Sequence, residues 1–265
     1  MKYKMIVSDF DGTLGKVPHE IQEETVKTIK KYQQQGGIFV ICSGRGPGNI
    51  QKIYSKHGLN GYLIGCQGSV ILDTKNDKEI WSGHLDKESA LKIIDEIKKT
   101  GFQAVVYYKG GIAYDIESDY VKFYLTTLKE SGVKVDNLSK FVETTKAYKI
   151  NAIVDPDKRD VIIKNFKKVL SNNVLVNSGS KHLVECVNVN CNKGQAVKSL
   201  AEYLNIDYKD IMTVGDSTND IELVLGEWHG VAVGDAEPEL KAVAKEITVP
   251  FENQPIKELI DKYCL

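Results

Sequence analysis

Two aspartates separated by a single phenylalanine, Asp9 and Asp11, follow an apolar run and precede a Gly-Thr pair. In an extended strand, side chains two residues apart point to the same face, so these carboxylates would repel each other. One explanation is a strand end with a turn, since Asp-Gly is typical of turns and Asp11 can hydrogen-bond its own backbone. The other is a divalent cation with an anionic substrate, which would give the two carboxylates different tasks.

Further polar groups follow other apolar runs. The reactive residues at strand ends are Asp9 and Asp11 after the first run, Ser43 after the second, and Asp216, Asn219 and Asp220 after the run at 211–215. In doubly wound sheets, ligands bind at the carboxyl edge of the strands near the point where the strand order reverses. The sequence therefore predicts that these separate peptides meet at one site.

Two of these signals also have plain structural explanations. Ser43-Gly44-Arg45 is compatible with a simple turn, but a hydroxyl and a backbone N–H at a strand end can also hold a phosphate oxygen. Lys193 in Asn-Lys-Gly is compatible with a solvated lysine. At a helix amino terminus, where the dipole favours anions, a lysine makes sense beside a bound phosphate.

The segment 215–220, GDSTND, contains more polar side chains than a helix cap requires. Asp216 or Ser217 alone could satisfy the first N–H groups of a helix. Carboxylate oxygens of Asp9 and Asp216 suit Mg²⁺, which binds one or two carboxylates together with waters and substrate phosphate. Several ambiguous signals, in order and each at a strand or helix end, coincide by chance less often than any one of them.

The bulk properties describe an ordinary globular chain. Its 265 residues suffice for one large domain or two smaller ones, and 35 basic against 36 acidic residues favour neither nucleic-acid nor membrane partners. The amino terminus has no apolar leader and no stretch approaches the roughly 18 to 20 apolar residues of a membrane span. We therefore expect a cytoplasmic protein, by default a monomer.

The cysteines indicate the same compartment. Five cysteines without a CxxC pair favour reduced thiols over a disulfide framework or a zinc site. Cys42 and Cys66 lie in apolar runs, and we expect both in the core.

Strand and helix patterns alternate at both ends of the chain. Predicted strands are 3–9, 37–44, 62–68, 211–216 and 230–235, and predicted helices are 19–36, 49–57, 194–205 and 238–244. The first helix places Ile21, Thr25, Ile29 and Tyr32 on one face. Near-continuous apolar strands between amphipathic helices predict an α/β fold, with a doubly wound, mostly parallel Rossmann-like sheet covered on both faces.

The middle of the chain has a different pattern. Residues 102–116 alternate with a period of two, and Gly110-Gly111 within them is a hairpin signal. Around them lie predicted helices at 86–99, 118–131 and 155–170 and strands at 148–154 and 182–189. We predict an α+β domain at 82–187, inserted into an α/β core made of 1–81 and 188–265.

The motifs together resemble those of the haloacid dehalogenase-like phosphatase superfamily. The matching residues are DFDGT at 9–13, Ser43 after an apolar strand, Lys193 in NKG, and GDSTND at 215–220. The motif order and the large insertion between the second and third motifs look like those of Cof-type sugar-phosphate phosphatases with an α/β cap of the C2 type. The motifs cover both ends of the chain, and the middle matches in length and rhythm.

The resemblance implies a mechanism. Asp9 would be the nucleophile and form an aspartyl-phosphate, while Asp11 would protonate the leaving alkoxide and then activate water. Mg²⁺ would be held by Asp9, the backbone carbonyl of Asp11 and Asp216, with Asp220 in or near the shell. The substrate would be a small phosphorylated metabolite, and the family points to a sugar phosphate.

The resemblance also implies the phosphate-binding groups. They would be the side chains of Ser43, Lys193 and Asn219, the backbone N–H groups of Phe10 and Asp11, and Gly44 after Ser43. Electrostatic stabilisation and positioning should supply most of the rate enhancement.

Some residues lie at the limits of the resemblance. Thr13 would either orient Asp11 or stabilise a turn, and Gln67 stands where relatives commonly carry Asn as a supporting substrate contact. No function is assigned to Trp228 or His229, and Tyr107, Tyr108 and His182 of the insertion are left outside the predicted site.

Three alternatives compete with a phosphatase. A phosphohexomutase of the same superfamily would share the nucleophile and metal but discharge the phosphoryl group to a sugar hydroxyl. A dinucleotide-binding protein is suggested by Gly44, Gly46 and Gly48, but their spacing differs from G-x-G-x-x-G and leaves the other motifs unexplained. An inactive phosphate-binding module would lack a required side chain, and none is missing.

Overall fold

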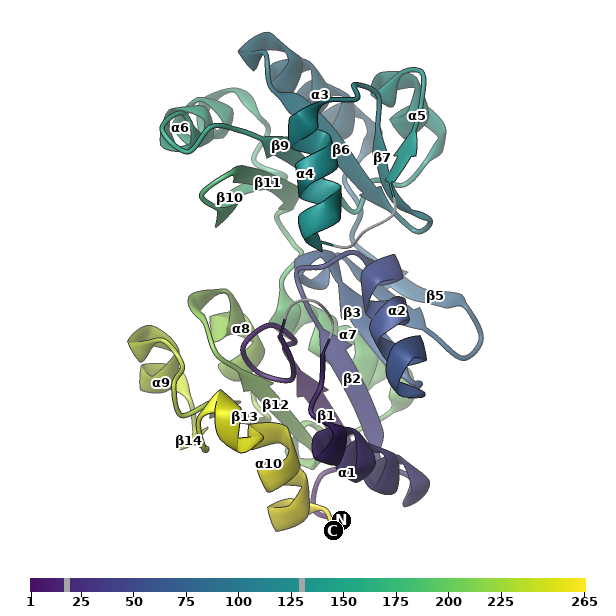
Figure 1. The fold of residues 1–265 in the computed structure, drawn as a ribbon, viewed down its shortest axis with the longest axis vertical. Coiled ribbons are helices and arrows are strands. Elements are labelled where there is room, and N and C mark those ends of the chain that lie inside the picture. The colour runs from purple at the N-terminus through teal and green to yellow at the C-terminus, as the bar shows by residue number, and fades with distance from the viewer. Residues whose placement is uncertain (17–19, 129–131) are drawn as a thin grey trace. The chain divides into compact units, whose positions relative to one another are not determined.

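The chain folds into two compact units, which are described separately. The computed structural model describes residues 1–16, 20–128 and 132–265. One unit comprises residues 1–45, 50–81 and 192–265, and the other comprises 46–49 and 82–191 (Figure 1).

The first unit is an α/β unit. Its strands and helices are β1 (Met5–Ser8), α1 (Glu23–Gln34), β2 (Ile38–Cys42), α2 (Pro47–His57), β3 (Tyr62–Gly65), β4 (Val70–Asp73), β5 (Lys78–Ser82), α7 (Lys193–Leu204), β12 (Ile211–Gly215), α8 (Ile221–Val224), β13 (His229–Ala232), α9 (Pro238–Val243), β14 (Glu246–Ile247) and α10 (Pro255–Tyr263). The sheet order is β14-β13-β12-β1-β2-β3-β4-β5. Neighbours from β14 to β3 are parallel and β4 is antiparallel to β3, which confirms the predicted mostly parallel α/β sheet.

Strand β1 lies in the middle of this sheet, and all four of its residues are buried. It pairs in parallel with β2 on one side and β12 on the other, with Met5 opposite Ile38 and Ile211. Met5 and Val7 pack in one core cluster with the apolar face of α7, while α1 and α10 lie on the other side of the sheet (Figure 1). Such double coverage explains why the strands are apolar throughout.

Helix α1 has the predicted apolar face. Ile21 before the helix and Thr25, Ile29 and Tyr32 within it are all buried. The helix begins at Glu23, later than the sequence pattern indicated, and His19 at the start of the predicted segment lies outside the described residues.

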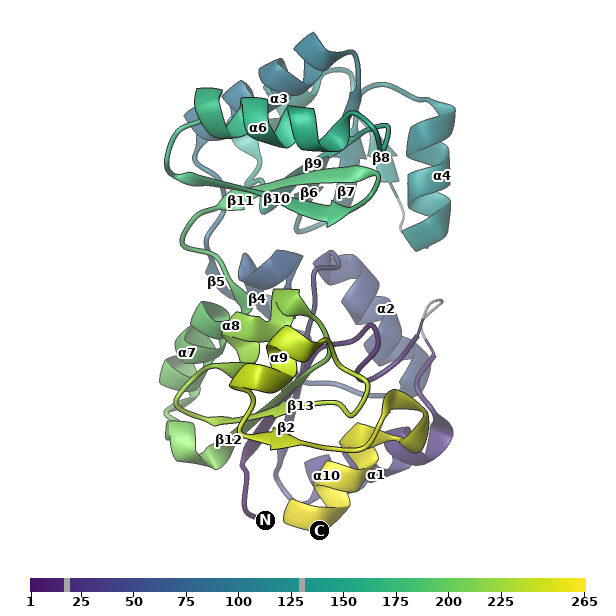
Figure 2. The same cartoon turned by 90° about the vertical axis from the view of Figure 1, so that its left-hand side faces the viewer.

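The second unit is an α+β unit built on its own sheet. Its elements are α3 (Lys87–Thr100), β6 (Gln103–Tyr108), β7 (Gly111–Tyr114), α4 (Asp119–Leu128), β8 (Gly132–Lys134), α5 (Leu138–Thr144), β9 (Lys149–Ile153), α6 (Arg159–Val169), β10 (Val174–Ser180) and β11 (Leu183–Asn188). The strand order is β10-β11-β9-β6-β7-β8, antiparallel except for the β7–β8 pair. Helices α3 and α6 lie over one face of the sheet (Figure 2).

The hairpin predicted at Gly110-Gly111 connects β6 and β7. Helix α4 corresponds to the predicted helix at 118–131, of which residues 129–131 lie outside the described part of the chain. The sequence did not predict α5, a seven-residue helix capped by the side chain of Asn137. Short helices of this kind carry too few apolar repeats to stand out from a loop.

Within the described ranges, no helix is both long and apolar enough to cross a bilayer. All five cysteine side chains are buried, and Cys42 and Cys66 lie in the core as predicted. The cytoplasmic location stays a prediction.

A tight backbone contact joins two loops of the first unit. Gly68 has φ +94°, and a Cβ added there would lie 2.2 Å from the backbone oxygen of Asn192. Residues 66–69 after β3 therefore pack directly against the start of α7, which begins at Lys193.

We expect Gly68→Ala to destabilise the first unit by at least about 3 kcal/mol, because it adds a backbone clash to the cost of positive φ. Gly36 is the matched control, since its φ is +91° but nothing lies within 4 Å of an added Cβ. Gly36→Ala should cost only about 1 to 2 kcal/mol. Urea unfolding followed by tryptophan fluorescence measures both, and equal losses would contradict the packing argument.

Candidate active site

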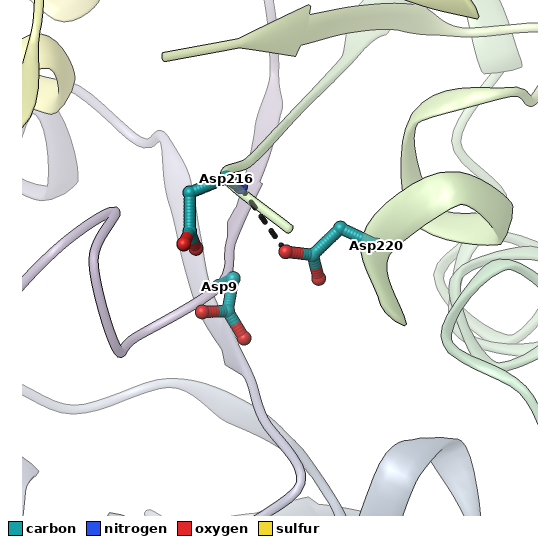
Figure 3. Close-up of side chains that lie close together, drawn as sticks. All are labelled: Asp9, Asp216 and Asp220. Atoms are coloured by element: carbon teal, nitrogen blue, oxygen red, sulfur yellow. Dashed lines mark hydrogen bonds between the residues drawn. The ribbon is translucent and has the colours of Figure 1, made fainter. Parts of the chain in front are cut away.

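Three carboxylates meet at the carboxyl ends of β1 and β12. Asp9 follows β1, Asp216 follows β12, and Asp220 lies one short turn further on (Figure 3). One ligand atom from each can be chosen so that all three lie within 4.8 Å of one another. Asp9 is 5% exposed and Asp220 is fully buried, so this concentration of charge lies largely out of water.

The ammonium group of Lys193 lies among these carboxylates. Its Nζ donates at 2.6 Å to Asp9 Oδ1 and at 2.6 Å to Asp220 Oδ1. Lys193 is the first residue of α7, and the side chain of the preceding Asn192 caps that helix by accepting from Gln195 N. Burial alone would lower the pKa of Lys193, but the charges of Asp220 and Asp9 outweigh it and raise the pKa.

The carboxylates are themselves perturbed. Burial, reinforced by the charge of Asp220, raises the pKa of Asp9, while Lys193 opposes the rise. The same two causes raise the pKa of Asp216 to about 6, and a hydrogen bond from Thr13 works against them. Burial combined with a neighbouring carboxylate thus perturbs both groups, and perturbed pKa values of this kind are typical of functional sites.

Asp220 also shapes the loop that carries Asp216. Its Oδ2 accepts from the backbone N–H of Asp216 at 3.1 Å, drawn as a dashed line in Figure 3, and from that of Ser217 at 3.4 Å. Its other oxygen accepts from Lys193. Ser217 forms a capping box with Asp220, as the capping explanation of GDSTND expected of Asp216 or Ser217, and the same Asp220 carboxylate pairs with the ammonium.

Thr13 has a different partner from the predicted one. Its hydroxyl donates to Asp216 Oδ1 at 2.9 Å, whereas the sequence interpretation paired it with Asp11 or with a turn. The prediction for Asp11 was wrong because the turn after β1, with Gly12 at φ +86°, brings Thr13 toward the β12 loop. Gly12 itself is so close to Asp216 that an added Cβ would lie 2.6 Å from Oδ2.

Asp11 pairs with Arg45, to which the sequence had given no role beyond a turn. Arg45 donates from Nε to Asp11 Oδ2 at 2.8 Å and from a terminal nitrogen to Oδ1 at 2.7 Å. The only signal in the sequence was a basic residue two positions after Ser43. Asp11 is not one of the three carboxylates whose ligand atoms lie within 4.8 Å of one another, but its charge contributes to the raised pKa of Asp216.

Ser43 lies at the end of β2 as predicted and is buried. Its own N–H donates to Ile64 O and is therefore already used. Its hydroxyl accepts from Arg45 N at 3.2 Å and keeps its proton for donation to a ligand. The loop after β3 lies against this turn, since Gln67 N donates to Ser43 O and a Cβ on Gly44 would lie 2.6 Å from Gln67 Nε2. Gln67 thus borders the predicted phosphate-binding turn, with a strained φ of +59°.

The other predicted phosphate-binding residues, Phe10 and Asn219, lie in the loops after β1 and β12. Asn219 is exposed beside Asp220, and its Oδ1 accepts from Ser217 Oγ at 2.9 Å. The ring of Phe10 is buried, and its backbone oxygen accepts from the N–H groups of the turn that follows it. The predicted phosphate-binding roles of these residues stay predictions.

The donor set suits a divalent cation. One ammonium among three carboxylates leaves two negative charges, which a divalent ion would balance. Carboxylate oxygens are hard ligands of the kind that Mg²⁺ and Ca²⁺ prefer. Burial and the charge of Asp220 raise the pKa values of Asp9 and Asp216, and a bound cation would favour their charged forms.

A comparison with known families identifies the family of the chain. A family model described as haloacid dehalogenase-like hydrolase matches residues 6–260. The chain belongs to this family. The match extends through both ends and the insertion, so it confirms the resemblance drawn from the motifs and the predicted class of hydrolytic enzyme.

Relatives of this hydrolase cover nearly its whole length. It is 26% identical to 5-amino-6-(5-phospho-D-ribitylamino)uracil phosphatase YwtE of Bacillus subtilis over 98% of this chain and 97% of the relative. A crystal structure of a haloacid dehalogenase-like hydrolase from Bacteroides thetaiotaomicron has a TM-score of 0.90 at 22% identity, covering 98% and 99% of the two chains. A subclass IIB sugar phosphatase of the superfamily has a TM-score of 0.78 at 16% identity and 98% coverage of both chains. The two structures confirm the fold.

The crowding of carboxylates predicts that Asp216→Asn stabilises the metal-free protein at neutral pH. The folded-state pKa of about 6 lies above the ordinary value of 3.8. The charged Asp216 therefore does not destabilise the fold below pH 4. Its unfavourable contribution to the stability grows as pH rises through the folded pKa and is complete above it. We expect a gain on the order of 1 to 2 kcal/mol at pH 8, after allowing for partial exposure, and little gain at pH 4.

The measurement is urea unfolding in a chelator at the two pH values. Asp207→Asn, at an exposed carboxylate, serves as control and should change little. Asparagine keeps an acceptor for Thr13, so a loss of stability at pH 8 would mean that Asp216 does not suffer from nearby negative charge.

Proposed function

We propose that the protein is a Mg²⁺-dependent phosphatase that hydrolyses a small phosphorylated metabolite, a sugar phosphate, through an aspartyl-phosphate on Asp9. The observation that carries the proposal is the buried Asp9 carboxylate, held by Lys193 beside Asp216 and Asp220. A carboxylate that is desolvated, oriented and surrounded by further hard oxygens is suited to attack on phosphorus.

Asp9 would act first. Lys193 holds its Oδ1 at 2.6 Å, so Oδ2 is the oxygen that attacks the phosphorus. As the Oδ2–P bond forms, the bond from phosphorus to the leaving oxygen breaks. Asp11 gives that oxygen a proton, which lets it depart as an alcohol.

The second half returns the enzyme to its starting state. A water oxygen attacks the phosphorus of phosphorylated Asp9 and the P–Oδ2 bond breaks, with its electron pair returning to the Asp9 carboxylate. Asp11, now a carboxylate, accepts the proton of the attacking water. Inorganic phosphate leaves.

Several hydrogen-bond donors would neutralise the oxygens of the transferring phosphoryl group. We assign its oxygens to Ser43, Lys193, Asn219, Gly44 and the backbone N–H groups of Phe10 and Asp11. These donors lie on loops that the sheet brings to one edge, so their orientation is set before the reaction begins.

The metal would be held by Asp9, Asp216 and the backbone carbonyl of Asp11, with Asp220 in or near the shell. When bound, Mg²⁺ would offset the charge of the carboxylates and of the phosphoryl group. Asp220 also accepts from Lys193 and from loop N–H groups, so it would hold the ammonium and the loop as well.

The assignment of a sugar phosphate draws on the motif order and on the relatives. One relative is named for a substrate with a phosphorylated ribityl chain, and one structural neighbour is named a sugar phosphatase. The inserted unit at 82–187 is the predicted source of substrate selectivity. A phosphohexomutase would use the same first half and differ in the acceptor of the phosphoryl group.

We expect hydrolysis of p-nitrophenyl phosphate to require Mg²⁺ and to fall by at least about 10³-fold in Asp9→Asn, because the amide is a poor nucleophile. Asparagine has nearly the same shape, so the fold should persist. Steady-state rates with Mg²⁺ and with chelator measure the effect, and Asp207→Asn is the matched surface control. Turnover that survives in Asp9→Asn would exclude Asp9 as the nucleophile.

The acceptor is determined by product analysis. With a hexose monophosphate, a phosphatase releases inorganic phosphate and free sugar in equal amounts. Isomerised hexose phosphate without net phosphate release would instead establish the mutase.

A further inference from the structure

The pair formed by Arg45 and Asp11 is built asymmetrically. The side chain of Arg45 is only 8% exposed, whereas that of Asp11 is 46% exposed. The guanidinium carbon lies 5.1 Å from the centre of the Phe10 ring, so the group rests on a buried aromatic face. Two parallel N–H···O bonds join it to both oxygens of Asp11.

The backbone of Arg45 is fixed on both sides. Its N–H donates to Ser43 Oγ at 3.2 Å, and its carbonyl accepts from Cys66 N at 2.8 Å. It lies in the short connection between β2, which ends at Cys42, and α2, which begins at Pro47. Arg45 is thus a rigid holder, and Asp11 is the more exposed partner whose orientation depends on it.

This geometry determines which role of Asp11 the pair supports. Guanidinium has five N–H donors and no acceptor, so both oxygens of Asp11 serve as acceptors in the pair. Each oxygen keeps a second lone pair that can accept from a water molecule. A carboxyl group carrying a proton toward a leaving oxygen would have to give up one of the two bonds.

We propose that Arg45 is a positioning residue for the second half of the reaction, in which Asp11 accepts the proton of the attacking water. This inference rests on the function proposed above. The water O–P bond forms and the P–Oδ2 bond to Asp9 breaks, its electron pair returning to Asp9, while the water proton passes to the Asp11 oxygen that Arg45 orients. Protonated Asp11 then leaves the bidentate pair and supplies the proton for the next leaving group.

The proposal predicts a change in kcat without a change in kcat/KM. With p-nitrophenyl phosphate, the leaving group departs with little need for an acid, and kcat/KM reports only the steps up to that departure. Arg45→Met should lower kcat about tenfold, as part of the contribution of a positioned base, and lower KM by the same factor. The ratio kcat/KM should stay within about twofold, because phosphorylated Asp9 accumulates instead.

The experiment measures these constants with Mg²⁺ and the phosphorylated fraction of the chain after acid quench, by intact mass. Arg159→Met is the matched control, since it removes an arginine that pairs with Asp160 at 2.8 Å on the surface of the other unit. Arg45→Lys should restore part of kcat, because an ammonium supplies donors without the planar fork. In an Asp11→Asn background, Arg45→Met should have no further effect on kcat.

The results distinguish this inference from the function beneath it. Wild-type protein without turnover or a phosphorylated Asp9 would overturn the proposed function itself. Phosphorylated protein that accumulates in Asp11→Asn but not in Arg45→Met would overturn the role of Arg45 alone, as would a kcat/KM that falls as far as kcat. If Arg45→Met does not fold, Arg45→Lys and Arg45→Gln give the same comparison.

Discussion

The structure of the site depends on a single buried ammonium. Lys193 donates at 2.6 Å to Asp9 from one loop and to Asp220 from another, with all three groups removed from water. Desolvating such charges costs several kcal/mol per ion unless each is paired with good geometry. The start of α7, the end of β1 and the loop after β12 are therefore fixed relative to one another, because displacement of any one would leave a charge buried without a partner.

The surrounding loops hold Lys193 and its partners in position. Asn192 caps α7 and so places Lys193 at the first helical position, while Gly68 lets the loop after β3 pack against the same turn. Asp220 uses its second oxygen to hold the N–H of Asp216, so the loop beyond β12 is ordered by a residue that also pairs with Lys193. A metal would add positive charge to a framework whose ligands are already oriented, and little reorganisation would be required.

Much of the fold could be predicted because its signals are local. The apolar runs and the face formed by Thr25, Ile29 and Tyr32 identified a parallel sheet covered by helices, and strand ends indicated where Asp9 and Asp216 would meet. Helix α5 was missed since seven residues hold too little periodicity. The partner of Thr13 was predicted wrongly because a turn with positive φ at Gly12 changes the direction of the side chain that follows.

The sequence by itself determined the chemical inventory of this protein, its carboxylates, hydroxyl, lysine and glycines, and the order of strands and helices that carries them. Residue type and periodicity suffice for this, since both act within a few neighbours along the chain. Only the tertiary structure decided the pairing, with Lys193 between Asp9 and Asp220, Thr13 on Asp216 and Arg45 on Asp11. Such partners are separated by 27 to 203 positions, and a separation of that kind is bridged by sheet register and loop direction rather than by spacing in the sequence.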